Sequence, residues 1–172
     1  MDRRLGRSRG VSDFEDLYRA SRDDVYAYVA TLLRDRFAAE DVTALAFERA
    51  YRKRSTFRPG RGSERAWLFG IARNAALDEL RRRARSTAVD SDPADEVARP
   101  LEDEAELGAR RLVVRDALTS LAPRERELVA LKFFAGLSNS ELAAVLGTSE
   151  TNAGTRVHRA IHKLREACHE TA

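Results

Sequence analysis

The segment 149–168 carries the side chains whose types and spacing most clearly suit contact with DNA. Its apolar residues recur at helical spacing and form one stripe, made of Ala153, Val157, Ile161 and Leu164. At 100° per residue, polar and basic groups fall on and beside the opposite face of such a helix. That outer face consists of Thr151, Gly154, Thr155, His158, Arg159, His162 and Arg165. Hydroxyl, imidazole and guanidinium groups in this arrangement suit a helix that enters the major groove.

A capped turn precedes this helix. Ser138 and Glu141 have the spacing of a capping box, which predicts a helix over 138–146. Gly147 permits a tight turn, and Ser149 is placed to cap the next helix. Together these signals predict a helix-turn-helix. The apolar stripe alone is also compatible with an amphipathic helical hairpin that binds no DNA.

The two histidines of this segment have a second interpretation. His158 and His162 show the i, i+4 spacing of metal ligands, with Cys168 and His169 nearby. No second cluster of ligand-type residues accompanies them, and both lie where a recognition helix meets DNA. We therefore predict neither a metal site nor a cofactor.

A second polar stripe lies on segment 66–83, beside a loop at 55–63 that is rich in Pro, Gly and Arg. Within about 60° of helical rotation the stripe contains Trp67, Asn74, Asp78, Arg81 and Arg85. Rings stack on unpaired bases, an amide reads a base edge and arginines hold phosphates, so the stripe suits unwound DNA. Trp67 is also compatible with a place in the hydrophobic core.

The elements that must position both stripes are helices. Apolar residues recur at helical spacing, without the alternation typical of strands, so the sequence predicts an all-α fold. Ser12 and Glu15 look like a capping box that opens the first helix. The further helices are expected near 39–53, 64–85, 107–121, 123–135, 138–146 and 149–168.

Charge divides the chain into blocks. The net charge is +7 over residues 1–86, −7 over 87–109 and +3 over 110–172, which together give the +3 of the whole chain. Basic faces attract nucleic-acid phosphates, whereas an acidic connector is repelled by them. We predict two small helical domains joined by an acidic, flexible linker. The expected boundaries are a basic tail at 1–12, a helical domain at 13–86, the linker at 87–109 and a helix-turn-helix domain at 110–172.

Several motifs in order resemble the extracytoplasmic-function class of bacterial sigma factors. They are AEDV at 39–42, FERAYR at 47–52, WLFGIARN at 67–74 with Asp78 and RRR at 81–83, LTSLAPRERE at 118–127, and the helix-turn-helix. The resemblance covers nearly the whole chain, with residues 13–85 similar to sigma region two and 110–168 similar to region four.

The resemblance implies a subunit that binds core RNA polymerase and promoter DNA and directs transcription initiation. The positions that match polymerase-binding residues are Asp41, Ala44, Leu45 and Glu48. Those implied for the minus-ten element and its melting are Phe57, Arg58, Arg61, Trp67, Asn74 and Arg81. Those implied for the minus-thirty-five element are Thr151, Gly154, Thr155, His158 and Arg159. Proteins of this class are commonly held inactive by an anti-sigma protein.

Two positions depart from the class. Ala44 and Leu45 stand where a polar residue followed by an acid is usual, so an apolar contact with polymerase is expected there. Gly154 stands where a basic residue is common, at a cost in helix stability of roughly 1 kcal/mol.

Other function classes fit the sequence less well. An enzyme is not expected, because the chain has no phosphate-binding loop and no cluster of catalytic residues. A ligand-sensing transcription regulator would need neither the 55–63 loop nor the stripe that begins at Trp67. No apolar run is long enough to cross a membrane and no secretory signal is evident, so we expect a cytoplasmic protein without membrane contact of its own.

Overall fold

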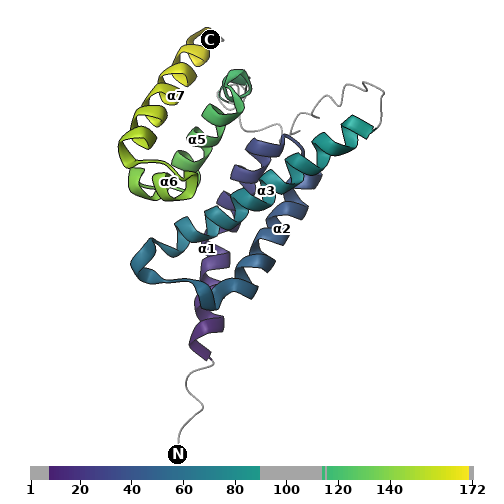
Figure 1. Cartoon of the computed structure of the whole chain (residues 1–172), viewed down its shortest axis with the longest axis vertical. Coiled ribbons are helices and arrows are strands. Elements are labelled where there is room, and N and C mark those ends of the chain that lie inside the picture. The colour runs from purple at the N-terminus through teal and green to yellow at the C-terminus, as the bar shows by residue number, and fades with distance from the viewer. Residues whose placement is uncertain (1–7, 90–113, 115, 171–172) are drawn as a thin grey trace, which may run out of the picture.

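The computed structural model describes residues 8–89, 114 and 116–170, and all regular secondary structure in these residues is helical (Figure 1). The N-terminal module contains α1 (Ser8–Leu33), α2 (Arg36–Lys53) and α3 (Glu64–Val89). The short 3-10 helices η1 (Arg54–Thr56) and η2 (Pro59–Arg61) connect α2 to α3. The C-terminal module contains α5 (Pro123–Phe133), α6 (Asn139–Leu146) and α7 (Glu150–Glu170), and residues 116–120 before it are also helical. The all-α prediction is confirmed.

Some predicted boundaries are wrong. The first helix begins at Ser8, so the Ser12–Glu15 pattern lies inside α1 and does not open it. Gly10 lowers helix propensity there but does not stop the helix. The second helix begins at Arg36, because Asp35 caps it by accepting a 3.1 Å hydrogen bond from the Ala38 N–H. The predicted linker lies mostly outside the described residues, although α3 runs three residues into it, to Val89.

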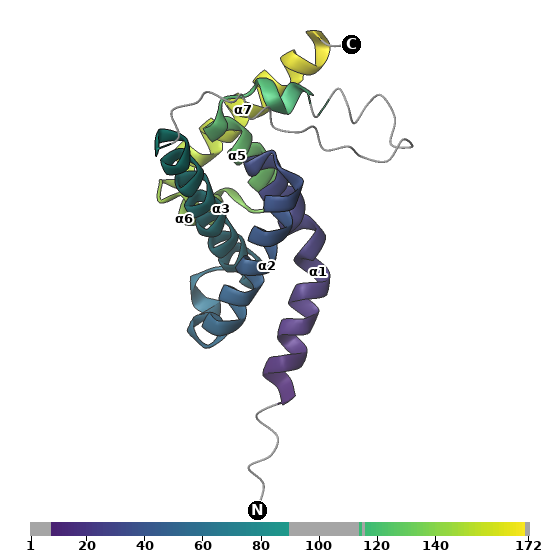
Figure 2. The ribbon, with the colours of Figure 1, turned by 90° about the vertical axis from the view of Figure 1, so that its right-hand side faces the viewer.

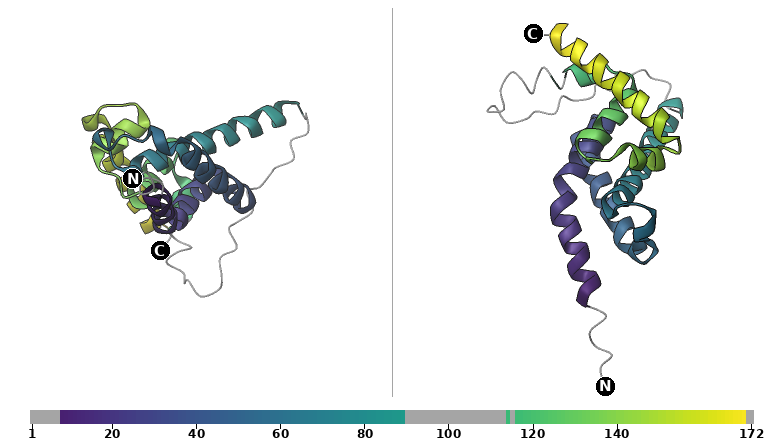
Figure 3. Two further views of the ribbon diagram at one scale, coloured as in Figure 1. Left: turned by 90° about the horizontal axis from the view of Figure 1, so that it is seen from below. Right: turned by 90° about the vertical axis from the view of Figure 1, so that its left-hand side faces the viewer.

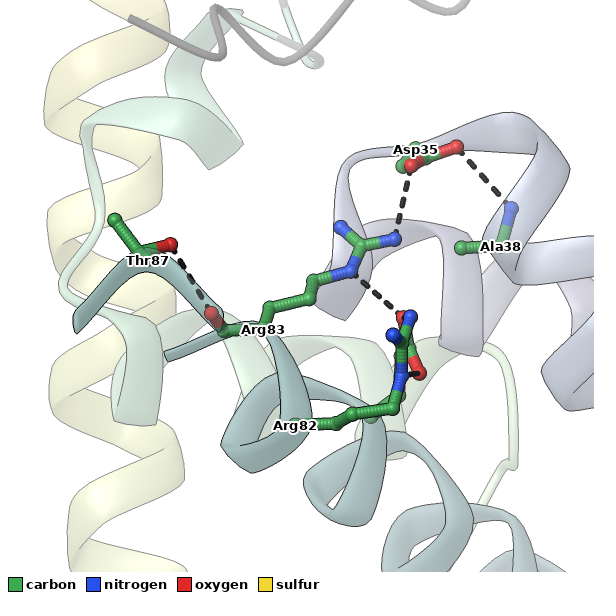
Figure 4. Close-up of polar contacts among 6 residues, drawn as sticks. Asp35, Ala38, Arg82, Arg83 and Thr87 are labelled. Atoms are coloured by element: carbon green, nitrogen blue, oxygen red, sulfur yellow. Dashed lines mark hydrogen bonds and ion pairs between the residues drawn. The ribbon is translucent and has the colours of Figure 1, made fainter. Parts of the chain in front are cut away.

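Asp35 also ties α3 to the junction of α1 and α2. Its second oxygen accepts a 2.9 Å hydrogen bond from Arg83 (Figure 4). Arg83 and Arg82 both reach Glu79, each at 2.8 Å. The hydrogen bond from Arg82, supported by that from Arg83, lowers the pKa of Glu79 to about 2. This ion cluster fixes the far end of α3 against the start of α2.

The helix-turn-helix follows its predicted caps closely. The Ser138 hydroxyl accepts from the Glu141 N–H at 3.2 Å, and Glu141 accepts from the Ser138 N–H at 2.9 Å. Gly147 ends α6 with φ 66°, in the left-handed region that suits glycine. The Ser149 hydroxyl then accepts from the Asn152 N–H at 3.2 Å at the start of α7. The capping box, the turn and the second cap are confirmed.

The two modules pack against each other, which the sequence did not predict. In Figures 2 and 3 the C-terminal module lies beside α1 and α3, where α5 contacts α1 and α6 contacts α3. Buried side chains of both modules, among them Phe69, Leu131 and Leu142, belong to one continuous hydrophobic cluster. The chain is therefore in a closed arrangement, with one core shared by two modules.

The Glu79 cluster predicts a stability that depends on pH. Because the folded-state pKa of Glu79 lies near 2, below its ordinary value of 4.5, its ion pairs stabilise the fold fully above about pH 4.5. That contribution is lost as the pH falls from about 4.5 toward 2. Glu79→Gln is expected to lower the urea midpoint at pH 7, and its difference from wild type should narrow below pH 4.5. Glu15→Gln removes an exposed pair with Arg19 and serves as the control with little effect. A Glu79→Gln deficit that does not change with pH would contradict the assignment.

The turn of the helix-turn-helix predicts opposite effects at two glycines. Gly147→Ala places a Cβ at positive φ and is expected to destabilise the protein by about 1 kcal/mol. Gly70→Ala lies inside α3, where an added Cβ meets no atom within 4 Å, and should be neutral or stabilising by up to about 1 kcal/mol. Urea unfolding of both variants measures the difference. Equal stability of the two variants would exclude a conformational role for Gly147.

Candidate nucleic-acid interface

The outer face of α7 is open to solvent in the closed arrangement. Its apolar stripe faces inward, with Ala153 and Val157 buried and Ile161 half-buried. The polar residues predicted for DNA contact that lie exposed are Thr151, Thr155, His158 and Arg159. A hairpin without a binding role explains the buried stripe equally well, but it gives no reason for the exposed basic and hydroxyl groups.

Gly154 differs from the other predicted contacts because it is half-buried and faces α6. A Cβ at this position would lie 3.1 Å from the amide nitrogen of Asn139. The glycine thus lets α7 pack closely against the start of α6. It offers DNA its backbone and no side chain.

The charges around this face are only partly paired within the protein. Lys163 binds Glu125 of α5, and His162 lies 3.4 Å from Glu166. In the described part of the chain, no three His, Cys, Asp or Glu side chains gather as a metal site would require. Arg159 and Arg165 remain exposed on a helix whose stripe points into the protein. These two exposed arginines suit contact with phosphates on both sides of a DNA major groove.

The loop and stripe of the N-terminal module meet at an aromatic pair. The rings of Phe57 and Trp67 are 5.6 Å apart, tilted by 52°, and both side chains are half-buried. Trp67 also packs against the core cluster, as the core interpretation expected, and its role in base stacking stays a prediction. Arg58 and Arg61 are exposed in the same connection. An aromatic pair with exposed arginines beside it can stack a nucleic-acid base and bind the neighbouring phosphates.

The rest of the α3 stripe extends away from this aromatic pair. Asn74 and Arg81 are both exposed. Arg81 lies 3.1 Å from Asp78, which also binds Arg49 of α2 at 3.1 Å. Asp78 therefore holds Arg81 beside the stripe and links α2 to α3.

Helix α3 has two faces with different tasks. Arg65, Phe69 and Arg73 follow one another at i, i+4 and i+8 and face the C-terminal module. The centre of the stripe formed by Trp67, Asn74 and Arg81 lies about 140° around the helix from this face. Docking of the C-terminal module thus leaves the predicted DNA stripe uncovered.

The predicted polymerase-binding residues form one exposed stripe on α2. Asp41, Ala44, Leu45 and Glu48 are all exposed, while the opposite face of α2 is buried in the core. The sequence reasoning missed Phe37, which lies one turn before Asp41 on the same stripe and is 71% exposed. Phe37 stands four residues before Asp41, which puts both side chains on one helix face, and this spacing was the signal that could have identified it. An open groove of about 390 Å³ borders Asp41, with Arg82 and Arg83 on its other side.

The sequence reasoning also missed the groups that join the modules. Glu127 of α5 is paired with Arg73 at 2.5 Å and accepts a 3.5 Å hydrogen bond from the Tyr28 hydroxyl. Burial raises the pKa of Tyr28 well above its ordinary value, and the negative charge of Glu127 raises it further. An acid directly before the apolar run Leu128–Leu131 was a weak sign of this contact, because a glutamate beside buried apolar residues is rarely buried without a partner.

Among the helices described, none is long and apolar enough to cross a membrane.

Comparison with known protein families agrees with these features. Residues 17–86 match the family Sigma-70 region 2, and residues 111–164 match Sigma-70, region 4. The sigma factor CarQ of Myxococcus xanthus is 35% identical over 161 residues, which cover 91% of this chain and 90% of CarQ. The ECF sigma factor BldN of Streptomyces coelicolor is 35% identical over 88% of this chain, which spans 58% of the length of BldN.

Two solved structures are similar over both modules. RpoE of Bartonella quintana, in complex with the anti-sigma factor NepR, is 27% identical with a TM-score of 0.73, covering 90% of this chain and 96% of that one. CnrH, in complex with the cytosolic domain of CnrY, is 25% identical with a TM-score of 0.66, covering 97% and 92%. Both matches span the two modules in one superposition. The chain therefore belongs to the extracytoplasmic-function class of RNA polymerase sigma factors.

Proposed function

We propose that this chain directs core RNA polymerase to a set of promoters and initiates transcription there without chemistry of its own. The observation that carries the proposal is that three separate stripes, on α2, α3 and α7, are exposed together on modules that match sigma regions 2 and 4. A polymerase surface and two DNA surfaces are what a sigma factor needs. Because polymerase and chromosome share the cytoplasm, we place its action there.

Each stripe has one proposed role. The α2 stripe around Leu45 binds polymerase, with Ala44 and Phe37 supplying apolar contact between the acids Asp41 and Glu48. The Phe57–Trp67 pair stacks a base of the opened minus-ten element, and Asn74 and the arginines follow the strand. The α7 face around His158 and Arg159 enters the major groove of the minus-thirty-five element.

A protein partner of the anti-sigma class is also proposed. RpoE is seen with the anti-sigma factor NepR bound and CnrH with the cytosolic domain of CnrY, and the similarity of both to this chain extends over its two modules. The closed arrangement found here is thus compatible with capture by a regulator. A regulator that covers the α2 stripe would compete directly with polymerase.

Reconstitution with core polymerase tests the proposed function. The full chain should support initiation from a subset of genomic templates. Leu45→Asp should weaken polymerase binding at least tenfold, because it places a charge in an apolar contact. Glu15→Ala is the control, since Glu15 lies on α1, outside the α2 stripe, and forms an exposed pair with Arg19. If the folded chain supports promoter-specific initiation from none of the templates, the proposal is refuted.

The α7 face generates a salt-dependence prediction. Arg159→Ala is expected to weaken binding to promoter DNA and to reduce the slope of log K against log salt by about one phosphate contact. Titrations of holoenzyme with labelled promoter at several salt concentrations measure that slope. Glu166→Ala on the same helix should leave the slope unchanged or raise it slightly. An unchanged slope for Arg159→Ala would remove Arg159 from the phosphate contacts.

A further inference from the structure

All three histidines of the chain lie on α7, and they share one face of that helix. His158, His162 and His169 stand at i, i+4 and i+11, which places them within about 40° of helical rotation. The centre of this histidine face is turned by about 140° from the apolar stripe of α7 that packs into the protein. All three imidazoles are exposed, and α7 lies at the outer edge of the molecule in Figure 1. The histidines are therefore concentrated where α7 is proposed to meet DNA.

Fixed positive charges accompany the histidine face. Arg165 lies within about 20° of His158 around the helix, and Arg159 lies about 100° from it. Both arginines are exposed. Like charges nearby disfavour a protonated imidazole, whereas the phosphates of a bound DNA favour it. Binding of DNA by this face should therefore be coupled to an uptake of protons.

One acid of α7 borders the same face. Nδ1 of His162 lies 3.4 Å from a carboxylate oxygen of Glu166, and the two side chains are 65% and 62% exposed. Beside a neutral imidazole, the carboxylate of Glu166 repels DNA phosphates. A protonated His162 balances that charge. Proton uptake at His162 thus adds an attraction and removes a repulsion.

The elements packed against α7 are α5, α6 and the segment at 116–121. Their charged side chains are carboxylates, guanidiniums and one ammonium. They are Asp116, Arg124, Glu125, Arg126, Glu127, Lys132 and Glu141. Of the ordinary side chains, imidazole is the one whose charge changes between about pH 8 and pH 5. A change in DNA affinity over that range is therefore expected to come from the histidine face.

We propose that His158 and His162 make promoter binding by α7 proton-dependent: as the pH falls, each imidazole gains a positive charge that contacts DNA phosphates. This inference rests on the proposed function. His158 lies about two turns into α7 and His162 one turn further, about 6 Å apart along an axis that enters a groove about 12 Å wide. His169 lies about 16 Å beyond His158, away from the N-terminal turns with which a recognition helix contacts DNA.

Titrations of holoenzyme with labelled promoter at about pH 8 and about pH 6 test the proposal. Wild type should bind about fivefold or more tightly at the lower pH, with a salt slope steeper by about one to two phosphate contacts. His158→Gln combined with His162→Gln leaves polar groups that never become charged, so the affinity ratio between the two pH values should fall to about twofold or less. His158→Arg combined with His162→Arg keeps the charge at both pH values and should show the steeper slope at both.

The ratio is taken within each variant, so a general loss of affinity cancels. His169→Gln is the matched control on the same face and should keep the wild-type ratio. A pH indicator in weakly buffered solution near pH 7 should report uptake of protons when wild-type holoenzyme binds promoter, and less uptake for the double Gln variant.

Equal affinity ratios in wild type and the double Gln variant would overturn the proposal, as would an equal loss of the ratio in His169→Gln. If wild type initiates transcription at both pH values while its ratio matches that of the double Gln variant, the proposed function stands and this inference alone fails. If wild type initiates from none of the templates at either pH, the proposed function is refuted and the inference fails with it.

Discussion

The ion pair between Arg73 and Glu127 sets the geometry on which the rest of the molecule depends. A buried ion pair adds little net stability, because desolvation of both charges offsets their attraction. It does require that the two groups meet, however, because burying either charge without its partner would cost several kcal/mol of folding free energy. The pair thus selects one orientation of α5, which packs on α1, relative to α3. Because α6 and α7 pack on α5 or on each other, that choice also fixes the outward direction of the α7 face.

Helix α3 combines two roles that are often given to different elements. Its Arg65–Phe69–Arg73 side binds the neighbouring module, and its Trp67–Asn74–Arg81 side remains free. Both sides belong to one continuous helix, α3. The Asp35–Arg83–Glu79 cluster holds the distal end of this helix to α2.

Local signals were the part of the fold that sequence reasoning predicted well. Ser138, Gly147 and Ser149 act on backbone groups within three or four residues, so their spacing alone located α6 and α7. Helical periodicity placed the α3 stripe for the same reason. The docking could not be predicted, because Arg73 and Glu127 are distant in sequence, and the position of Glu127 beside an apolar run is only a weak local sign that does not name its partner. The start of α1 was missed because helices extend through positions of poor propensity when nothing terminates them, and Phe37 was missed because exposure of an aromatic group cannot be read from its type.

The close approach at Gly154 constrains how this protein can be redirected to new target sequences. A Cβ there would lie 3.1 Å from the side-chain amide nitrogen of Asn139, so the exposed Asn139 side chain would have to shift by a few tenths of an ångström. Under the proposed role of α7, exchange at Gly154 would therefore alter the contact with α6 as well as the proposed DNA face. Exposed neighbours such as Thr155 and His158 carry no such coupling, so libraries that seek orthogonal specificities should be diversified at those positions with Gly154 held constant.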